Sequence, residues 1–351
     1  MLHTLATVAD AEADTRAVTD SLARPLRDLR LSVIDTCNFR CPYCMPESEY
    51  PEHHAFLPAS HRLDFDQMIR LVQAFEALGV RKLRITGGEP LLRRHLPDFI
   101  RRLRAETGIA DLAMTTNGLL LERFAQPLKQ AGLDRITLSL DSLNPETFLR
   151  MTGGRGRLEQ VLAGLDAAVE AGFHSIKINV MVQRGVNDQC VLPMVERFRH
   201  TPHVLRFIEY MDVGTENRWR PSQVVPSREL LQRIGERWPL VPVEKNYHGE
   251  VANRYQFADG GGEVGFISSV SEPFCGDCTR ARVSTDGKLY TCLFARDGTD
   301  LRPWLEQNEP QALEQTIRRL WSARGDRYSE LRDPQRQPAD GKKIEMYQIG
   351  G

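Results

Sequence analysis

The sequence predicts an α/β fold in which a parallel sheet forms a partial, six-unit barrel, followed by a smaller C-terminal α+β region. Short apolar runs alternate with amphipathic helical stretches from about residue 29 to residue 210, and such alternation favours a parallel sheet covered by helices. Six strand units occur there, whereas a closed barrel of this kind has eight. After about residue 215 glycine-rich and strand-like segments replace the alternation, so we expect a second region there.

The units of the barrel are recognised one by one from apolar runs and helix-capping residues. The expected strands cover residues 29–34, 82–85, 111–115, 135–140, 175–182 and 204–208. The expected helices cover residues 65–78, 97–104, 122–130 and 158–171. Asp64 is placed to cap the first helix at its N-terminus, and Gly79, Gly132 and Gly172 stand where helices are expected to end.

The chain divides into three expected parts. Residues 1–21 lack a basic start and a clear apolar core, so we expect a poorly ordered leader and no secretory signal. Residues 22–220 form the expected barrel. Residues 221–351 form the C-terminal region, with helices expected at 227–237 and 310–323. Asp286-Gly287 predicts a hairpin with a two-residue type I′ turn.

Composition excludes several classes of protein. A net charge of −1 gives no overall attraction to nucleic acid or to a membrane surface, and no apolar run is long enough to span a bilayer. Six of the seven cysteines fall into two tight groups. This pattern fits metal binding in a reducing compartment better than a disulfide framework. We therefore expect a cytoplasmic protein in which Cys190, the isolated cysteine, is an ordinary buried thiol.

The first cysteine group follows the first expected strand. Cys37, Cys41 and Cys44 have the spacing C-x3-C-x2-C. Iron–sulfur clusters held only by protein normally take four cysteines, so three would leave one iron open, and an open position is where metal chemistry occurs. A zinc site or a packed cysteine cluster is the alternative explanation of the spacing.

Other polar motifs follow the remaining strands. Active sites of parallel α/β barrels form at the C-terminal ends of the strands. There the sequence has Gly87-Gly88-Glu89-Pro90, Thr115-Thr116-Asn117-Gly118, Ser139-Leu140-Asp141 and Glu209-Tyr210-Met211, while Lys177 and Asn179 alternate within the fifth strand. Each motif is weak alone, but together they gather polar groups around one barrel mouth.

The second cysteine group is Cys275, Cys278 and Cys292, with the spacing C-x2-C-x13-C. On spacing alone, a structural zinc site competes with an iron–sulfur cluster. A turn centred on Asp286-Gly287 would set Cys292 opposite Ala281, close to Cys278. Arg280 and Arg282 alternate along the strand between the cysteines, and guanidinium groups suit phosphate or a purine edge. In an ideal flat hairpin Cys292 would face away from both arginines, so a twist or a bulge is needed to bring them together.

These motifs, with the terminal Gly350-Gly351, resemble the GTP 3',8-cyclase family of radical S-adenosylmethionine (SAM) enzymes over roughly residues 22–351. The resemblance implies a partial TIM-type barrel of the radical SAM type and two [4Fe-4S] clusters. One cluster would be held by Cys37, Cys41 and Cys44, and the other by Cys275, Cys278 and Cys292. It implies SAM contacts at Tyr43, Gly88, Ser139 and Met211. It implies GTP contacts at Arg30, Arg84, Thr115, Lys177, Arg280 and Arg282. The resemblance does not distinguish Thr115 from the adjacent Thr116 as the GTP contact.

The resemblance also implies a reaction and partners. SAM would yield a 5'-deoxyadenosyl radical that starts the cyclisation of GTP to (8S)-3',8-cyclo-7,8-dihydroguanosine 5'-triphosphate, the first step of molybdenum cofactor synthesis. Gly350 and Gly351 would reach into the active site. A reductant such as flavodoxin or ferredoxin and a downstream cyclic pyranopterin monophosphate synthase are the implied partners, and a homodimer is compatible with the family. The alternatives are another radical SAM enzyme with an auxiliary cluster, such as a peptide-modifying one, and a non-enzymatic zinc protein.

Overall fold

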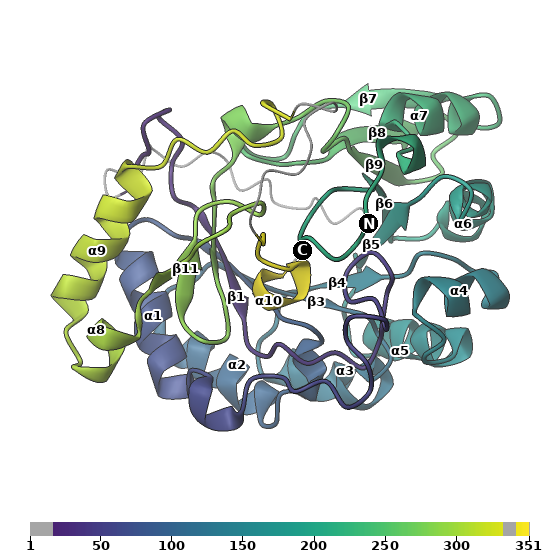
Figure 1. The fold of residues 1–351 in the computed structure, drawn as a ribbon. Coiled ribbons are helices and arrows are strands. Elements are labelled where there is room, and N and C mark those ends of the chain that lie inside the picture. Colours follow the sequence, from purple (N-terminus) through teal and green to yellow (C-terminus); the bar gives the residue numbers. More distant parts are fainter. Residues whose placement is uncertain (1–16, 333–341, 351) are drawn as a thin grey trace, which may run out of the picture.

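A twelve-stranded sheet forms the centre of the structure, a computed structural model that describes residues 17–332 and 342–350 (Figure 1). Its strand order is β12-β11-β10-β1-β2-β3-β4-β5-β6-β9-β8-β7. The six expected strands are confirmed as β1 Asp28–Ser32, β2 Lys82–Thr86, β3 Asp111–Thr116, β4 Arg135–Ser139, β5 Lys177–Val182 and β6 Val204–Glu209. All five pairings between them are parallel, as the strand–helix alternation predicts.

Helices connect these strands and cover the sheet (Figure 1). They are α1 Phe65–Ala77, α2 Leu96–Glu106, α3 Leu121–Gln130, α4 Pro145–Met151, α5 Leu158–Glu170 and α6 Val191–Phe198. Short 3-10 helices occur at Ala59–His61, Pro90–Leu92, Asp188–Cys190, Pro221–Gln223 and Cys275–Asp277. The Asp64 side chain accepts a hydrogen bond from the Gln67 backbone N–H, and the Gln67 side chain accepts one from Asp64. This reciprocal pair is a capping box, so the expected cap of α1 is confirmed.

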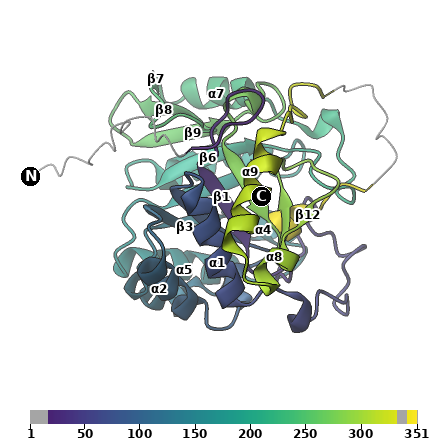
Figure 2. The same ribbon diagram turned by 90° about the vertical axis from the view of Figure 1, so that its left-hand side faces the viewer.

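The C-terminal segment extends both edges of the same sheet. Strands β7 Leu240–Val243, β8 Asn253–Phe257 and β9 Glu263–Ile267 continue it beyond β6, with β9 parallel to β6. Strands β10 Arg280–Val283, β11 Lys288–Tyr290 and β12 Thr299–Asp300 continue it beyond β1, with β10 parallel to β1. Its helices are α7 Ser227–Gly235, α8 Arg302–Glu306, α9 Pro310–Ser322 and α10 Met346–Ile349. Helix α9 packs beside α1 (Figure 2).

The hairpin between β10 and β11 differs from the prediction by one residue in register. Arg282 pairs with Tyr290, and the Ser284 backbone N–H donates to the Lys288 carbonyl at 3.0 Å. The loop therefore has three residues, with Gly287 in the left-handed region at φ 84°, as in hairpins that end in a glycine bulge. Extending this register places Cys292 opposite Arg280 rather than Ala281. The predicted two-residue turn was wrong, and the bulge supplies the shift that brings Cys292 to the face of the arginines.

Part of the expected leader packs into the fold. Val18 and Asp20 are buried, and the Val18 backbone N–H donates to the Leu78 carbonyl at 3.2 Å. The expectation of poor order therefore fails for residues 17–21, because their buried backbone groups form hydrogen bonds with the rest of the fold. The rest of the expected leader, residues 1–16, lies outside the described residues. No helix within the described ranges is both long enough and apolar enough to cross a membrane.

Candidate active site

The loops that follow β1, β2 and β3 are tied together at the mouth of the barrel. Glu89 is buried, and its carboxylate accepts hydrogen bonds from Thr116 Oγ1 at 2.8 Å and from the Asn117 backbone N–H at 2.8 Å. Burial raises the pKa of Glu89 to about 7, against the opposing effect of these hydrogen bonds. The Glu89 backbone N–H in turn donates to the Thr36 carbonyl at 2.9 Å. Glu89 therefore fixes the loop that carries the first cysteine group relative to the next two strands.

The two glycines of this motif are explained by packing. A Cβ atom on Gly88 would lie 2.4 Å from the Thr36 carbonyl oxygen, and one on Gly87 would lie 2.3 Å from the Ile34 carbonyl oxygen. Gly87 also has a φ of 151°. The backbone thus approaches the end of β1 too closely for any side chain. The sequence predicted close approach to a ligand, and the neighbour found at both glycines is the backbone segment between β1 and Cys37.

The first cysteine triad (Cys37, Cys41 and Cys44) lies on one short loop. All three thiols are free, and the Cys44 backbone N–H donates to the Cys41 carbonyl at 2.9 Å, which closes the turn between them. Burial raises the pKa of Cys37 to about 12 and also raises the pKa values of Cys41 and Cys44. Neighbouring thiols add to this effect. Buried thiolates in one place call for a positively charged centre, so the triad fits an iron–sulfur core chemically.

A small cavity of about 310 Å³ lies next to this triad. Cys41, Tyr43, Ser139 and Asp141 are among its lining residues. The Tyr43 hydroxyl donates to Asp141 Oδ2 at 2.8 Å, which fixes the ring against the end of β4. Two of the four predicted SAM contacts, Tyr43 and Ser139, are therefore brought together beside the first triad.

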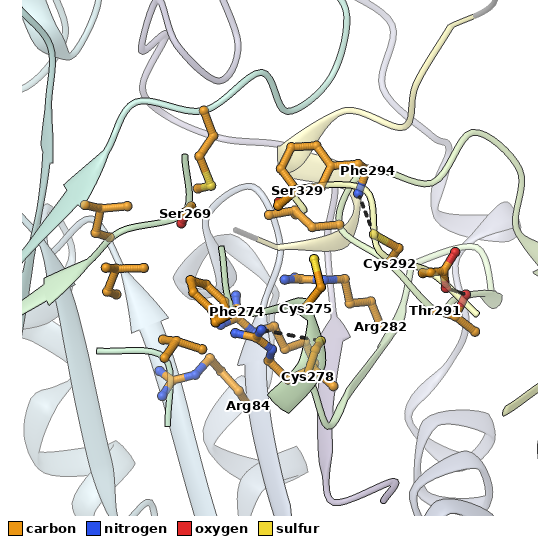
Figure 3. Close-up of a pocket in the computed structure, with 18 of the residues that line it drawn as sticks. Arg84, Ser269, Phe274, Cys275, Cys278, Arg282, Thr291, Cys292, Phe294 and Ser329 are labelled. Atoms are coloured by element: carbon orange, nitrogen blue, oxygen red, sulfur yellow. Dashed lines mark hydrogen bonds between the residues drawn. The ribbon is translucent and has the colours of Figure 1, made fainter. Parts of the chain in front are cut away.

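A larger cavity of about 1020 Å³, open to solvent, contains the second cysteine triad (Cys275, Cys278 and Cys292), as Figure 3 shows. Six other predicted site residues line it: Arg30, Arg84, Thr115, Met211, Arg280 and Arg282. The two triads form no compact ion site, because within residues 17–332 and 342–350 no three His, Cys, Asp or Glu side chains converge on one ion. A cubane cluster binds each thiolate at a different iron, so three thiols beside one cavity fit such a cluster chemically.

Three arginines form a row across the floor of this cavity. The register pairs Arg282 of β10 with Arg30 of β1, and Arg30 with Arg84 of β2. Burial lowers the pKa of each, and neighbouring guanidinium groups lower it further at all three. The pKa falls to about 10 at Arg84 and to about 9 at Arg282. Burial and repulsion between guanidinium groups disfavour the charged forms of these three arginines, so a bound polyanion would stabilise the row.

Thr115 and Thr116 are now distinguished by their surroundings. The Arg84 guanidinium donates to Thr115 Oγ1 at 3.0 Å and to Thr137 Oγ1 at 2.9 Å, and both threonines line the larger cavity. Thr116 points to the opposite face of β3, where it donates to Glu89. Thr115 is therefore the cavity residue of the pair.

The second triad has a different electrostatic setting from the first. Burial alone would raise the pKa of Cys278, but Arg280 and Arg324 outweigh it and lower the pKa to about 6. Arg280 Nη2 lies 3.4 Å from Cys278 Sγ as a hydrogen-bond donor. Burial raises the pKa of Cys292 to about 11. The second triad therefore also fits an iron–sulfur core, with a thiolate already stabilised at Cys278.

Two predicted contacts lie apart from both cavity linings, and several lining residues were missed. Neither Lys177 nor Gly88 is among the lining residues. Lys177 begins β5, and burial together with Arg206 and Arg135 lowers its pKa to about 6. Residues that line the larger cavity without having been predicted include Thr137, Arg206, Phe274 and Arg324. The signal for Arg206 was its alternation with Ile208 along the sixth strand.

The C-terminal tail enters the same cavity region. Arg282 Nη1 donates to the Gly350 carbonyl oxygen, and helix α10, which precedes Gly350, packs on β1. A Cβ atom on Gly350 would overlap Thr86 Oγ1, and its φ is 70°. Gly350 therefore meets Arg282 of the arginine row, while Gly351 lies outside the described residues.

Comparison with known families agrees with this architecture. Residues 31–198 match the model of the Radical SAM superfamily, and residues 203–330 match the model named Molybdenum Cofactor Synthesis C. Among solved structures, Streptococcus suis SuiB bound to S-adenosylmethionine superposes with a TM-score of 0.58 at 14% identity, covering 84% of this chain and 68% of SuiB. At that identity the likeness shows the shared fold alone.

Curated relatives are much more similar in sequence. GTP 3',8-cyclase of Xanthomonas axonopodis pv. citri (strain 306) is 60% identical over 337 residues, which cover 96% of this chain and 100% of the relative. The proteins of the same name from Acidothermus cellulolyticus and Staphylococcus haemolyticus are 48% and 45% identical, over 96% and 95% of this chain and 100% and 99% of their own lengths. The chain therefore belongs to the GTP 3',8-cyclase family of radical SAM enzymes, acts in molybdenum cofactor biosynthesis, and uses SAM and [4Fe-4S] clusters as cofactors.

Proposed function

We propose that the larger cavity binds GTP for 3',8-cyclisation, with the triphosphate on the arginine row and the guanine at the second cysteine triad. The observation that carries this assignment is the row Arg282, Arg30 and Arg84, which occupies neighbouring strands beside Cys278 and Cys292. A triphosphate carries about four negative charges. Arg280 and Arg206 line the same cavity, so the cationic side chains are numerous enough to compensate that charge.

The proposed roles of the cysteines follow from the open iron that three ligands leave. Cys37, Cys41 and Cys44 would hold the cluster that binds SAM, and Cys275, Cys278 and Cys292 would hold the cluster that meets the base of GTP. When bound, the cofactors supply a 5'-deoxyadenosyl radical that removes the hydrogen atom from C3' of the GTP ribose. The C3' radical would then add to C8 of guanine, and one electron from the reductant together with one proton would complete the cyclised nucleotide.

The protein's own contribution is to fix GTP at both ends and to exclude solvent. The phosphates would be bound by Arg30, Arg84 and Arg282, and the base would be bound at the second triad. Because both ends of GTP are fixed, the ribose between them has few possible orientations. Thr115 bonds to Arg84 and would orient that guanidinium group or meet a phosphate oxygen. Lys177 would bind GTP from deeper in the barrel. The tail at Gly350 and Gly351 would close the cavity beside Arg282.

The SAM contacts belong to the smaller cavity and its rim. Tyr43 and Ser139 line that cavity and would contact the adenosyl part of SAM. Met211 lines the larger cavity and would separate SAM from GTP. Gly88 would contact SAM through its backbone, since no side chain is available there.

The wider setting of the reaction is part of the same proposal. Residues 22–220 would form the SAM-cleaving unit and residues 221–351 the substrate-binding unit. A flavodoxin or ferredoxin would deliver electrons, and a cyclic pyranopterin monophosphate synthase would take the product. The protein would work in the cytoplasm, where its cysteines stay reduced, and a homodimer is the proposed assembly.

Isotope transfer tests the proposal directly. The protein is reconstituted with iron and sulfide without oxygen, reduced with dithionite and mixed with SAM and GTP carrying deuterium at C3'. Deuterium should appear in 5'-deoxyadenosine, and GTP deuterated at C2' should transfer none. Production of 5'-deoxyadenosine without deuterium from C3'-labelled GTP would contradict the proposed position of GTP.

A further inference from the structure

A buried ion group joins the beginning and the end of the described chain behind the second cysteine triad. Asp20 Oδ2 lies 2.6 Å from Arg24 Nε and 3.1 Å from Arg324 Nη1. All three side chains are at most 1% exposed. The indole N–H of Trp321 donates to the Arg24 carbonyl at 3.1 Å, and the Ser21 hydroxyl donates to the Arg324 carbonyl at 2.6 Å. We call Asp20, Arg24 and Arg324 the Asp20 group.

Both arginines also donate hydrogen bonds to the backbone of the cysteine segments. Arg24 Nη1 donates to the Cys275 carbonyl at 2.7 Å, and Arg324 Nη1 donates to the Cys278 carbonyl at 2.8 Å. Arg324 Nε donates to the carbonyl of Thr291, the residue before Cys292, at 3.1 Å. Every one of the three cysteine segments is therefore held by a guanidinium group that Asp20 fixes in place.

The neighbouring Asp326 adds a second carboxylate to this group. Asp326 lies 3.4 Å from Arg324 Nε and accepts a hydrogen bond from Thr291 Oγ1 at 2.6 Å. Two carboxylates thus face two guanidinium groups, so the network as a whole carries no excess charge. Arginine can hold several carbonyl oxygens at once because its donors form a rigid planar fork.

The second triad needs such support more than the first. Cys37, Cys41 and Cys44 share one tight turn, whereas Cys292 is separated from Cys278 by a whole hairpin. Only contacts between distant segments can fix the distance between these two thiols. Partners that orient metal ligands typically change metal affinity by about 10- to 100-fold when they are removed.

We propose that Asp20, Arg24 and Arg324 are positioning residues for the C-terminal [4Fe-4S] cluster, holding the three backbone segments that carry its cysteine ligands. The inference rests on the proposed assignment of that cluster to Cys275, Cys278 and Cys292. It does not depend on GTP turnover, so the two can fail separately.

The test isolates the second cluster. Replacing Cys37, Cys41 and Cys44 by alanine leaves a parent whose iron belongs to the second triad. Asp20→Asn and Arg324→Lys are added to it separately, and the rate of iron loss to a chelator and the electron paramagnetic resonance spectrum of the reduced cluster are recorded. We expect iron loss to become about 10-fold faster in both variants. Arg324→Lys, which keeps the charge but loses the fork, should also show a changed spectrum.

A matched control and a mirror experiment separate positioning from general instability. Glu263→Gln removes a carboxylate that lies 2.6 Å from the Arg254 guanidinium group, in a part of the sheet without these cysteines. The Glu263→Gln variant should retain iron like the parent. In the reciprocal parent, with Cys275, Cys278 and Cys292 replaced by alanine, Asp20→Asn should leave the first cluster unchanged.

Several results would overturn the inference. One is that Arg324→Lys retains iron as well as the parent does, and another is that Asp20→Asn loses iron equally from both clusters. A third such result is an effect of Glu263→Gln as large as that of Asp20→Asn. If Asp20→Asn does not fold, Arg324→Lys alone decides. A first parent that takes up no iron would overturn the cluster assignment itself, and the positioning role with it.

Discussion

The two cysteine triads have the same number of ligands but different surroundings. The first lies within one eight-residue loop, and burial raises the pKa of all its thiols. The second joins cysteines on both sides of a hairpin, and Arg280 and Arg324 lower the pKa of Cys278 to about 6. A cluster bound at the first would have the carboxyl groups of Glu89 and Asp141 nearby, and one at the second would face a cationic cavity. The difference suits one triad to cofactor cleavage and the other to an anionic substrate.

The largest expected effect comes from breaking the first triad. Cys37→Ala should abolish SAM cleavage, because on the proposed assignment it removes one of the three cysteine ligands of the SAM-binding cluster. The yield of 5'-deoxyadenosine measures this. Cys190→Ala is the control, since Cys190 is also a free thiol but lies outside both triads, where its sulfur accepts a hydrogen bond from the Ser142 hydroxyl at 3.2 Å. Equal losses in the two variants would contradict the distinct role of the triad.

Removing the cations of the second region should have the next largest effect. Arg280→Ala combined with Arg282→Ala should lower kcat/KM for GTP by roughly 100-fold or more, because each arginine is expected to make charge-assisted hydrogen bonds of about 1.5–3 kcal/mol. The first cluster should keep its iron and its absorbance. Normal GTP turnover by the double variant would show that these arginines do not bind the substrate.

A smaller effect is expected at the tail. Gly350→Ala should reduce turnover by about 10-fold, because a methyl group would overlap Thr86 and the φ of 70° disfavours alanine. Gly185→Ala is the control, since Gly185 also has a φ of 70° but a methyl group there would meet no atom within 4 Å. Steady-state kinetics should separate the two variants, and equal activity would argue against a role for the tail.

The smallest effect concerns stability and pH. The pKa of Lys177 falls from 10.5 to about 6 through burial and neighbouring cations. Between these values the unfolded chain binds more protons at this residue than the folded one, so this contribution to stability rises with pH. The stability gained by Lys177→Met should therefore be largest near pH 6 and shrink toward pH 9. Chemical denaturation at both pH values measures the difference in free energy of unfolding between the variant and the original protein. A difference that does not change with pH would mean that Lys177 stays charged in the folded protein.

Local sequence patterns were sufficient to predict most of the barrel. Contacts between residues far apart in the chain could not be predicted from them. All six parallel strands and the cap at Asp64 follow from apolar runs and one side chain. The register of the β10–β11 hairpin was missed because Asp286-Gly287 permits either a two-residue turn or a loop with a glycine bulge. The choice depends on packing that the sequence does not display.

The candidate site shows the same division. The cysteines and the alternating Arg280 and Arg282 are visible as spacing, and the structure brings both arginines into one cavity with their cysteine triad. The parallel pairing of β10 with β1, which creates the arginine row, joins residues about 250 positions apart. No local pattern encodes that pairing. For the same reason Asp20 could not be connected with Arg324 from the sequence.

The pairing of β1 with β10 has a consequence for synthesis of the chain. Until residues 280–283 leave the ribosome, β1 has only β2 as a neighbour and presents an unpaired edge. Exposed edges invite pairing with other chains, and contacts this distant in sequence slow folding. The nascent protein therefore passes through a long interval in which its first strand is open to aggregation, and binding of that edge by a chaperone would protect the half-made enzyme.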